Sequence, residues 1–212
     1  VMAPIARLPR VIFAQPDRLP GPETLGRRVV VLDIPFALPI AAADYPLHHP
    51  ETQAFGERVL QETTLDFIET LGERLVLWID HHEHAAWRRF HGDRRFRLAP
   101  PGDAPACAAL VDPDLFSEGK LDAVDTLVCH GDLDGVISAA RFLLRGKAPY
   151  PEALADAIAA DTRQGPLSPR GELLDRALKA RRDDETRRAA LRWLLHHDDE
   201  GRTWIEAAAA AY

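Results

Sequence analysis

Three groups of acidic and imidazole side chains each follow a short apolar run in this chain. Asp80-His81-His82 follows LVLWI at 75–79, and His130-Gly131-Asp132-Leu133-Asp134-Gly135 begins directly after LVC at 127–129. Asp33 closes VVVL at 29–32. Each run is typical of a buried strand, and open parallel sheets bind ligands at the carboxyl ends of their strands. Carboxylates mixed with imidazoles favour Mn²⁺ or Mg²⁺, and a set this large can hold two ions.

The spacing within the second group suits a metal-binding turn. Asp132 and Asp134 flank a single residue, which lets both carboxylates reach neighbouring metal positions. Gly135 permits a tight turn into the helix expected to follow. His130, two residues before Asp132, can bind the same ion.

The remaining groups complete a site for phosphate chemistry. His81 follows Asp80 at a strand end, and Asp33 is the natural bridging carboxylate if the three strands are neighbours. Two ions about 3.5–4 Å apart would lower the pKa of a bridging water and neutralise a phosphoryl oxygen. His82 and Arg163 could stabilise charge on the phosphorus oxygens without touching metal. These residues indicate a metal-dependent phosphoesterase.

Strand and helix patterns alternate along the chain and predict an α/β fold with a parallel, three-layer core. We expect strands at 11–14, 28–33, 75–80 and 125–130, and helices at 51–71, 104–111, 136–144 and 151–161. Residues 1–150 would form the catalytic core. Residues 151–212 would form a helical segment packed on that core, with an alanine-rich tail at 207–211 that frays. The segment 34–50 contains four prolines and is expected to be a functional loop.

Composition narrows the class of protein. The 212 residues are 46% hydrophobic and 28% charged, which is typical of a globular protein. No apolar stretch approaches the roughly 20 residues that span a bilayer, and the start lacks a signal-peptide pattern, so a cytoplasmic location without membrane contact is expected. A net charge of −7 argues against a protein that coats nucleic acid. Cys107 and Cys129 are expected to be small buried residues.

A basic, aromatic stretch follows the Asp80-His81-His82 group. It can be interpreted as a platform for single-stranded nucleic acid or as a solvated amphipathic helix. The arginines concerned are Arg88, Arg89, Arg94, Arg95 and Arg97. The pairs His48-His49 and His196-His197 are assigned to a surface loop and to a helix end, and neither enters the candidate site.

Taken together, these motifs resemble those of the DHH phosphoesterase superfamily. That family includes RecJ-like exonucleases, oligoribonucleases, cyclic-dinucleotide phosphodiesterases and manganese-dependent pyrophosphatases. Its first motif, HxDxDG, is matched by residues 130–135, and Asp33 is similar to its second, a strand-terminal Asp. Asp80-His81-His82 matches the third, the DHH triplet. Asp161, in the sequence ADTR, resembles the fourth.

The resemblance implies a division of labour among these residues. It assigns His130, Asp132 and Asp33 to one divalent ion. Asp134, Asp33, His81 and Asp161 would bind the other. Asp80 would orient the histidines, and His82 would contact the substrate phosphate.

The chain departs from the family pattern in three ways. Its motifs run in the order second, third, first, fourth, which predicts a circular permutation. Asp33 and Asp80 are separated by a long loop and a helix. The glycine- and histidine-rich signature of the family's C-terminal substrate-binding domain is absent. The resemblance covers residues 11–165.

The sequence therefore predicts a two-metal phosphohydrolase. It would use Mn²⁺ or Mg²⁺, with His82, Asp80 and Arg163 as catalytic residues and a metal-bridged hydroxide as nucleophile. The expected substrate is a small phosphodiester, a short oligonucleotide or a nucleotide monoester. A single-strand-specific nuclease, a manganese pyrophosphatase and an inactive nucleotide-binding regulatory module remain alternatives.

Overall fold

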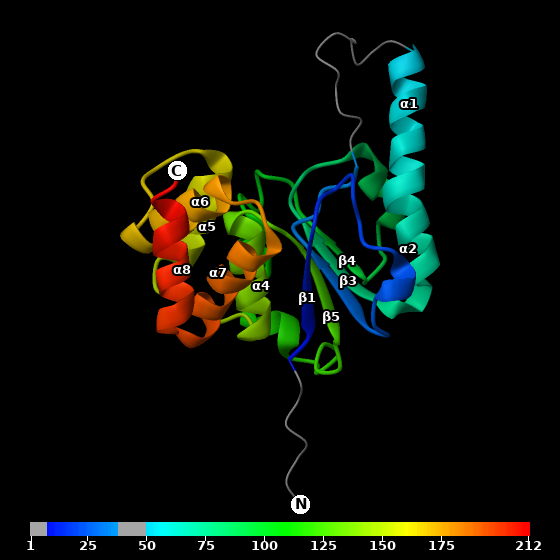
Figure 1. Ribbon diagram of the computed structural model, residues 1–212. Coiled ribbons are helices and arrows are strands. Elements are labelled where there is room, and N and C mark those ends of the chain that lie inside the picture. The colour runs from blue at the N-terminus through cyan, green and yellow to red at the C-terminus, as the bar shows by residue number, and fades with distance from the viewer. Residues whose placement is uncertain (1–7, 38–49) are drawn as a thin grey trace, which may run out of the picture.

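The computed structural model, which describes residues 8–37 and 50–212, is built around a parallel β-sheet (Figure 1). Five strands form the sheet in the order β1-β5-β2-β3-β4, and every neighbouring pair is parallel. The strands are β1 (Arg10–Ala14), β2 (Val29–Leu32), β3 (Leu75–Asp80), β4 (Phe96–Leu98) and β5 (Thr126–His130). The predicted α/β class and parallel sheet are confirmed.

The central strand β2 is apolar throughout because both of its faces are covered. Val30 and Leu32 pack into the hydrophobic core on one face of the sheet, and Val29 and Val31 pack into the core on the other face. All four residues have no solvent exposure. A strand covered on both faces cannot use the alternating pattern of a half-exposed strand, so it appears as a continuous apolar run.

Helices cover both faces of the sheet and give three layers (Figure 1). On one side lie α1 (Pro50–Leu60) and α2 (Asp66–Leu71), which a π-helical turn (Gln61–Leu65) joins. On the other side the structure has α3 (Cys107–Leu110), α4 (Leu133–Leu143), α5 (Ala153–Thr162), α6 (Pro169–Ala180), α7 (Asp184–His196) and α8 (Asp199–Ala209). Short 3₁₀ turns lie at Pro22–Thr24, Gly72–Arg74, Ala85–Phe90 and Pro113–Phe116.

The C-terminal helices pack on the sheet layer through α4. Trp193 of α7 and Ile205 of α8 are buried in the same hydrophobic cluster as the strand residues Leu127 and Leu32. Ala208 and Ala209 are helical and almost fully buried, so the expectation that the tail at 207–211 frays is wrong for 207–209, whereas Ala210 and Ala211 lie beyond the helix and are exposed. Small side chains there allow α8 to lie close against α6, which a low-complexity reading of the sequence does not reveal.

Two further elements differ from the sequence expectations. Residues 96–98 form the edge strand β4 and not part of an amphipathic helix, because their backbone pairs with residues 78–80 of β3. Helix α4 begins at Leu133, three residues earlier than expected, so Asp134 is helical. Most of the proline-rich segment 34–50, including His48-His49, lies outside the described residues. Within the described ranges, none of the helices combines the length and apolarity that crossing a membrane requires.

Candidate metal centre

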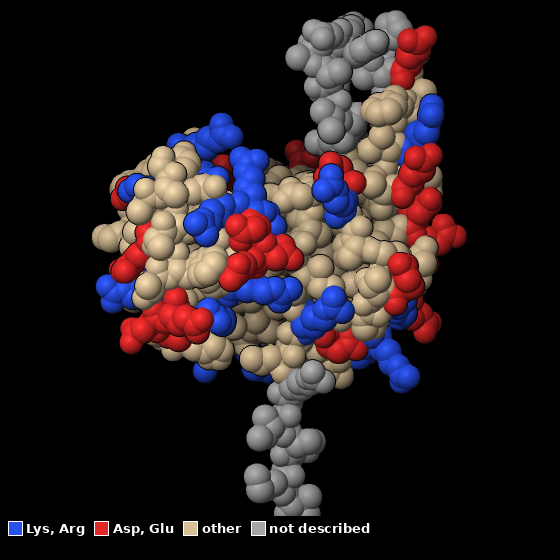
Figure 2. All heavy atoms as spheres, viewed as in Figure 1, with Lys and Arg blue, Asp and Glu red and all other residues tan. Residues whose placement is uncertain are grey.

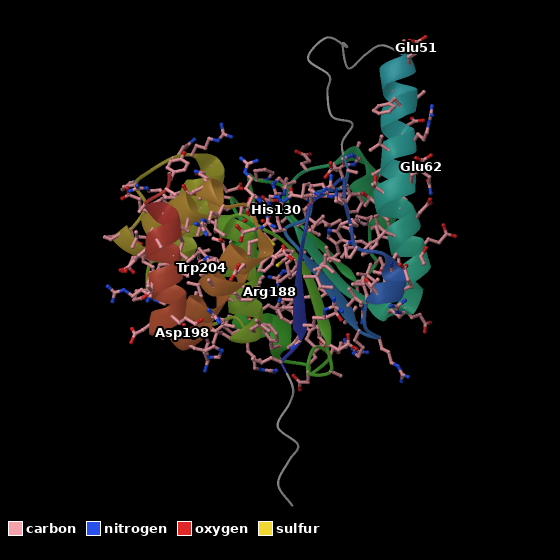
Figure 3. The ribbon with its side chains drawn as sticks, viewed as in Figure 1. Glu51, Glu62, His130, Arg188, Asp198 and Trp204 are labelled. Carbon is pink, nitrogen blue, oxygen red and sulfur yellow. The ribbon has the colours of Figure 1, made fainter. Side chains whose placement is uncertain are left out.

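The candidate site lies where the sheet reverses its direction of winding. The chain leaves β5 into α4 on one face and leaves β2 towards α1 and α2 on the other. Because β5 and β2 are adjacent, their carboxyl ends flank the kind of crevice in which α/β sheets bind ligands. Figure 3 shows His130 at this edge, between the two helical layers.

Three adjacent strands deliver the predicted groups to that edge. His130 ends β5, Asp33 follows β2, and Asp80 ends β3, in the spatial order β5-β2-β3. The expectation that these three strands gather at one sheet edge is therefore met. In chain order the same strands run β2, β3, β5, so the polar groups meet only after folding.

His81 lies at the centre of a ring of carboxylates. Its Nε2 is 3.5 Å from Asp33 Oδ1, 3.6 Å from Asp134 Oδ2 and 3.5 Å from Asp161 Oδ2. These separations exceed the roughly 2.7–3.2 Å of an ordinary N–H···O hydrogen bond. The side chain is buried, and burial together with the neighbouring His82 lowers its pKa. A neutral imidazole surrounded by carboxylates at this range is suited to share a cation with them.

Ligand atoms at the site fall into three groups, in each of which they lie within 4.8 Å of one another. The first contains Asp33, His130 and Asp132, and the second contains His81, Asp134 and Asp161. The third joins Asp33 to His81 and His82. Asp33 thus belongs to two of these groups, which share no other member, so its carboxylate lies within reach of both sets of ligand atoms.

Asp33 is buried without a hydrogen-bond donor. Its side chain has no solvent exposure, and neither carboxylate oxygen has a hydrogen-bond partner among the described residues. Burial, followed by the charges of Asp134 and Asp132, raises its pKa well above the usual value. Its backbone is left-handed, with φ of 58°, and its N–H donates to the Ile79 carbonyl at 2.9 Å. A non-glycine residue held in this region by its surroundings is a recurring feature of functional sites.

Asp134 is held in place by the start of α3. Its carboxylate accepts hydrogen bonds from the backbone N–H groups of Cys107 at 2.7 Å and Ala108 at 3.0 Å, and from Ser138 Oγ at 3.3 Å. Burial and the charge of Asp132 outweigh these donors and raise the pKa of Asp134 to about 7. Residues 104–111 therefore have a role that the sequence did not indicate, which is to fix one carboxylate of the site.

The loop between β5 and α4 takes its shape from two glycines and an N-cap. Asp132 caps α4 by accepting from the Gly135 N–H at 3.0 Å, and its Oδ2 lies 2.8 Å from His130 Nδ1. A Cβ on Gly135 would lie 2.4 Å from the His130 carbonyl oxygen, so no other residue fits there. Burial acts to raise the pKa of Asp132, but His130 and the cap outweigh it and lower that pKa.

Asp80 and His82 form a pair beside this ring. Asp80 is fully buried, and its Oδ1 lies 2.8 Å from His82 Nδ1. Burial opposes protonation of His82, but the bond to Asp80 outweighs it and raises the pKa of the histidine. His82 is 38% exposed, so its remaining ring nitrogen can reach a ligand from solvent.

Of the residues predicted from the sequence, Arg163 is the one that the structure leaves apart. It is exposed and forms the left-handed C-cap of α5, two residues after Asp161. In the described part of the chain, no hydrogen bond or ion pair joins it to the metal-type residues. Its role in phosphate binding remains a prediction.

Two residues beside the loop were not predicted from the sequence. Gln15 Oε1 lies 3.1 Å from His130 Nε2, and Gln15 directly follows β1, so a search of every strand end would have found it. Arg187 of α7 donates from Nε to the Gly131 carbonyl at 3.3 Å, and its side chain is 12% exposed. A Cβ on Gly131 would lie 2.2 Å from Arg187 Nε. Nothing in the local sequence links positions 56 residues apart.

The basic stretch after the triplet divides into paired and exposed arginines. Arg95 binds Asp93, with Nη2 at 2.7 Å, and Arg97 binds Asp112 at 2.5 Å. Arg88, Arg89 and Arg94 are exposed. On the face visible in Figure 2, basic and acidic side chains are interspersed and form no continuous basic surface.

Both cysteines are buried and free, as the sequence predicts. Burial raises the pKa of Cys107 well above its usual value, and the charges of Asp33 and Asp134 add to that effect. Burial also raises the pKa of Cys129. Neither thiol is activated for chemistry, because both are held in the neutral form.

Comparisons with known proteins do not assign the chain to a group. No protein-family model, no curated protein and no solved structure matches it.

Proposed function

We propose that this chain is a metal-dependent phosphoesterase of the DHH type with permuted motif order. The observation that carries the proposal is the buried carboxylate of Asp33, which has no hydrogen-bond partner among the described residues. It belongs at once to the group of His130 and Asp132 and to a group containing His81. A buried carboxylate without donors is costly, and a divalent cation removes that cost. Oxygen and imidazole donors together suit Mn²⁺ or Mg²⁺.

The residues present fit two ions that share Asp33. His130, Asp132 and Asp33 would hold one, and Asp33, His81, Asp134 and Asp161 would hold the other. The ions would supply Lewis-acid chemistry, lowering the pKa of water and neutralising phosphoryl oxygens. The backbone donors of Cys107 and Ala108 fix Asp134, so its orientation would not change on binding.

His82 would act on the substrate. Asp80 holds its Nδ1 at 2.8 Å, which leaves Nε2 for a phosphoryl oxygen or a leaving-group oxygen. Because the pair with Asp80 raises the pKa of His82, the ring is more often protonated near neutral pH and can donate a proton. Asp80 therefore acts by orienting and charging His82, since it touches the ring rather than the substrate.

The spatial order of the strands supports the permuted arrangement. The strand that bears the HxDxDG loop lies beside the strand of Asp33, which lies beside the strand of the DHH triplet. The first-motif strand comes last in the chain, but it pairs in parallel with both β1 and β2. A sheet can be assembled from the same strands in another chain order as long as these pairings are kept.

A single-strand-specific exonuclease is the second candidate. The exposed side chains of Arg88, Arg89 and Arg94, on the segment that directly follows the triplet, favour it. An inactive nucleotide-binding module is less well supported, because a protein that had lost its metals would gain stability by losing the repelling carboxylates around Asp33.

The test is hydrolysis with Mn²⁺ of bis-p-nitrophenyl phosphate, dinucleotides, short single-stranded DNA and RNA, nucleoside monophosphates and pyrophosphate. We expect turnover of at least one phosphodiester, two Mn²⁺ bound per chain by elemental analysis, and loss of both in Asp132→Ala. Asp114→Ala, an exposed acidic residue far from the cluster in sequence, is the control. Folded protein that takes up no metal and hydrolyses no panel member would refute the proposal.

A further inference from the structure

A hollow lies at the outer edge of the sheet, on the chain segment that follows the Asp80-His81-His82 group. It has a volume of about 460 Å³, and part of its wall is made by the aromatic residues Trp87, Phe90 and Phe96 together with Leu98. Trp87 and Phe90 belong to the 3₁₀ turn that begins three residues after His82, and Phe96 and Leu98 belong to β4. This volume lies in the range of small-ligand sites.

Strand register connects the hollow to the site. Leu98 pairs with Asp80 across β4 and β3, and Phe96 pairs with Trp78. Paired residues of parallel neighbours lie about 4.8 Å apart and project to the same face. Asp80 is the residue that holds His82, so the wall of the hollow begins one strand away from the group proposed to meet the phosphate.

The aromatic wall is already arranged as a stack. The rings of Phe90 and Phe96 are stacked, with centroids 4.2 Å apart and an interplanar angle of 29°, and Trp78 stacks on Phe96 at 6.4 Å and 20°. Phe36 packs edge-on against Phe90 at 5.6 Å and fixes it from the side. A wall of fixed, half-buried rings suits a planar aromatic ligand.

The positive charge of two arginines at the rim of the hollow favours anionic ligands over neutral ones. Arg88 and Arg94 line the hollow and are exposed, and within the described residues neither has an acidic partner. The neighbouring Arg95 is neutralised by Asp93. Two free guanidinium groups beside an apolar wall complement a ligand that is both aromatic and anionic.

We propose that this hollow binds the nucleobase of a nucleotide substrate, next to the base's own phosphate at His82. The inference rests on the proposed phosphoesterase function and narrows its substrate to a nucleotide diester. The aromatic wall would bind any base by stacking. Arg88 and Arg94 would contact a neighbouring phosphate of the same nucleotide chain.

The test compares one substrate that carries bases with one that carries none. Wild-type protein, Phe90→Leu and the double variant Arg88→Ala/Arg94→Ala are assayed with Mn²⁺ on the RNA dinucleotide pApA and on its abasic analogue, the same sugar–phosphate diester without bases. Loss of one stacked base corresponds to about a tenfold change or more, so we expect KM for pApA to rise at least tenfold in both variants. Turnover of the abasic analogue, which has no planar ring to stack, should stay within twofold of wild type in Phe90→Leu. Arg182→Ala/Arg188→Ala, two exposed arginines of the helical segment, is the matched control.

A binding measurement separates this inference from the proposed function. Calorimetric titration of AMP into the same proteins should give binding that Phe90→Leu weakens at least tenfold. Hydrolysis of the abasic analogue, with no binding of AMP and no preference for pApA, would overturn the base subsite and leave the phosphoesterase proposal intact. AMP binding that depends on Phe90, without hydrolysis of any diester, would overturn the phosphoesterase proposal and keep the subsite. Equal losses on both diesters in Phe90→Leu would also overturn the subsite.

Discussion

Two buried aspartates, Asp33 and Asp156, differ in what surrounds them. Asp156 lies on α5 and accepts hydrogen bonds from Tyr150 Oη at 2.7 Å and from the N–H and Oγ of Ser168 at 2.6 and 2.5 Å. Asp33 is as deeply buried, but neither of its oxygens has a donor within the described residues. Asp156 ties α5 to the start of α6, whereas Asp33 ties nothing together.

Burial alone therefore does not identify a functional carboxylate. Removing a charged group from water costs several kcal/mol unless donors or a cation replace the water. Asp156 has such donors, whereas no described residue donates a hydrogen bond to the Asp33 carboxylate, and the charges of other carboxylates raise its pKa. This contrast supports the proposal that Asp33 binds a cation.

The largest expected effect comes from removing the charge of Asp33. In Asp33→Asn we expect hydrolysis of the best panel substrate to fall at least about a thousandfold, because each ion supplies several kcal/mol of charge stabilisation. The melting temperature of the metal-free variant should equal or exceed that of wild type, since the repelling charge is gone. Steady-state kinetics and thermal melts in EDTA measure the two quantities.

A stabilising role for the Asp33 carboxylate would give the opposite pattern. Asp33→Asn would then melt well below wild type in EDTA while retaining activity with Mn²⁺. Asp17→Asn, an exposed aspartate of the same N-terminal region, serves as the control and should change neither quantity.

The second-largest expected effect is a loss of stability on substitution of Asp156. Asp156→Ala leaves the Tyr150 hydroxyl and the two Ser168 donors without an acceptor, and each unsatisfied group costs about 1 kcal/mol or more. We expect the free energy of unfolding to fall by about 3 kcal/mol in urea titrations, with Mn²⁺ binding unchanged at temperatures where the variant is folded. Loss of Mn²⁺ binding from folded Asp156→Ala would erase the contrast between the two residues.

The third effect is a pH dependence that metal should abolish. Burial raises the pKa of Asp134 to about 7 in the folded chain, above its ordinary value near 4. A carboxyl whose pKa is raised by folding stabilises the folded state fully below the unfolded value, and that stability is lost as pH rises through the folded value. In EDTA the protein should therefore be more stable at pH 5 than at pH 8.

Saturating Mn²⁺ is expected to remove this difference, because the ion takes the place of the proton. Urea unfolding at both pH values, with EDTA and with Mn²⁺, measures it. Metal-free stability that rises from pH 5 to pH 8 would contradict the assignment of Asp134 to the site.

The smallest expected effect is on Mn²⁺ affinity and concerns Arg187, which lies beside the ligand groups. Arg187 donates to the carbonyl of Gly131, between His130 and Asp132, and so orients the loop without belonging to the ligand groups. Substitution of a residue that orients metal ligands typically weakens metal binding about 10- to 100-fold. We expect Arg187→Gln to weaken Mn²⁺ binding about tenfold in calorimetry.

Arg188→Gln is the matched control, since Arg188 is exposed on the same helix. Figure 3 labels its position. An equal loss of Mn²⁺ affinity in both variants would indicate a general charge effect and not a contact with the loop.

Much of the fold could be predicted from local patterns. The apolar runs at 29–32, 75–79 and 127–129 are long enough to identify three buried strands, and each ends in the polar residue that it delivers. β4 was missed because three half-exposed residues, Phe96, Arg97 and Leu98, carry no such run. It pairs with β3 through its backbone, which leaves little trace in the side chains.

The metal-type residues of the candidate site could be predicted from the same apolar runs, but the groups that hold them in place could not. Asp33, His81 and Asp134 stand at strand ends or directly after them, where topology alone brings them together. The donors of Cys107 and Ala108, and the contact from Arg187, come from elements distant in sequence. Which helix end meets which carboxylate is decided by tertiary packing, and packing leaves no periodic signal.

The place of β5 in the sheet has a consequence for synthesis on the ribosome. β5 lies between β1 and β2, although it is made long after both. A nascent chain that ends before Thr126 has two apolar strands with no shared partner, and such edges favour aggregation. Its high-separation contacts also predict slow folding. Assembly of the acidic cluster must therefore be a late event, completed after the chain has emerged past Asp161.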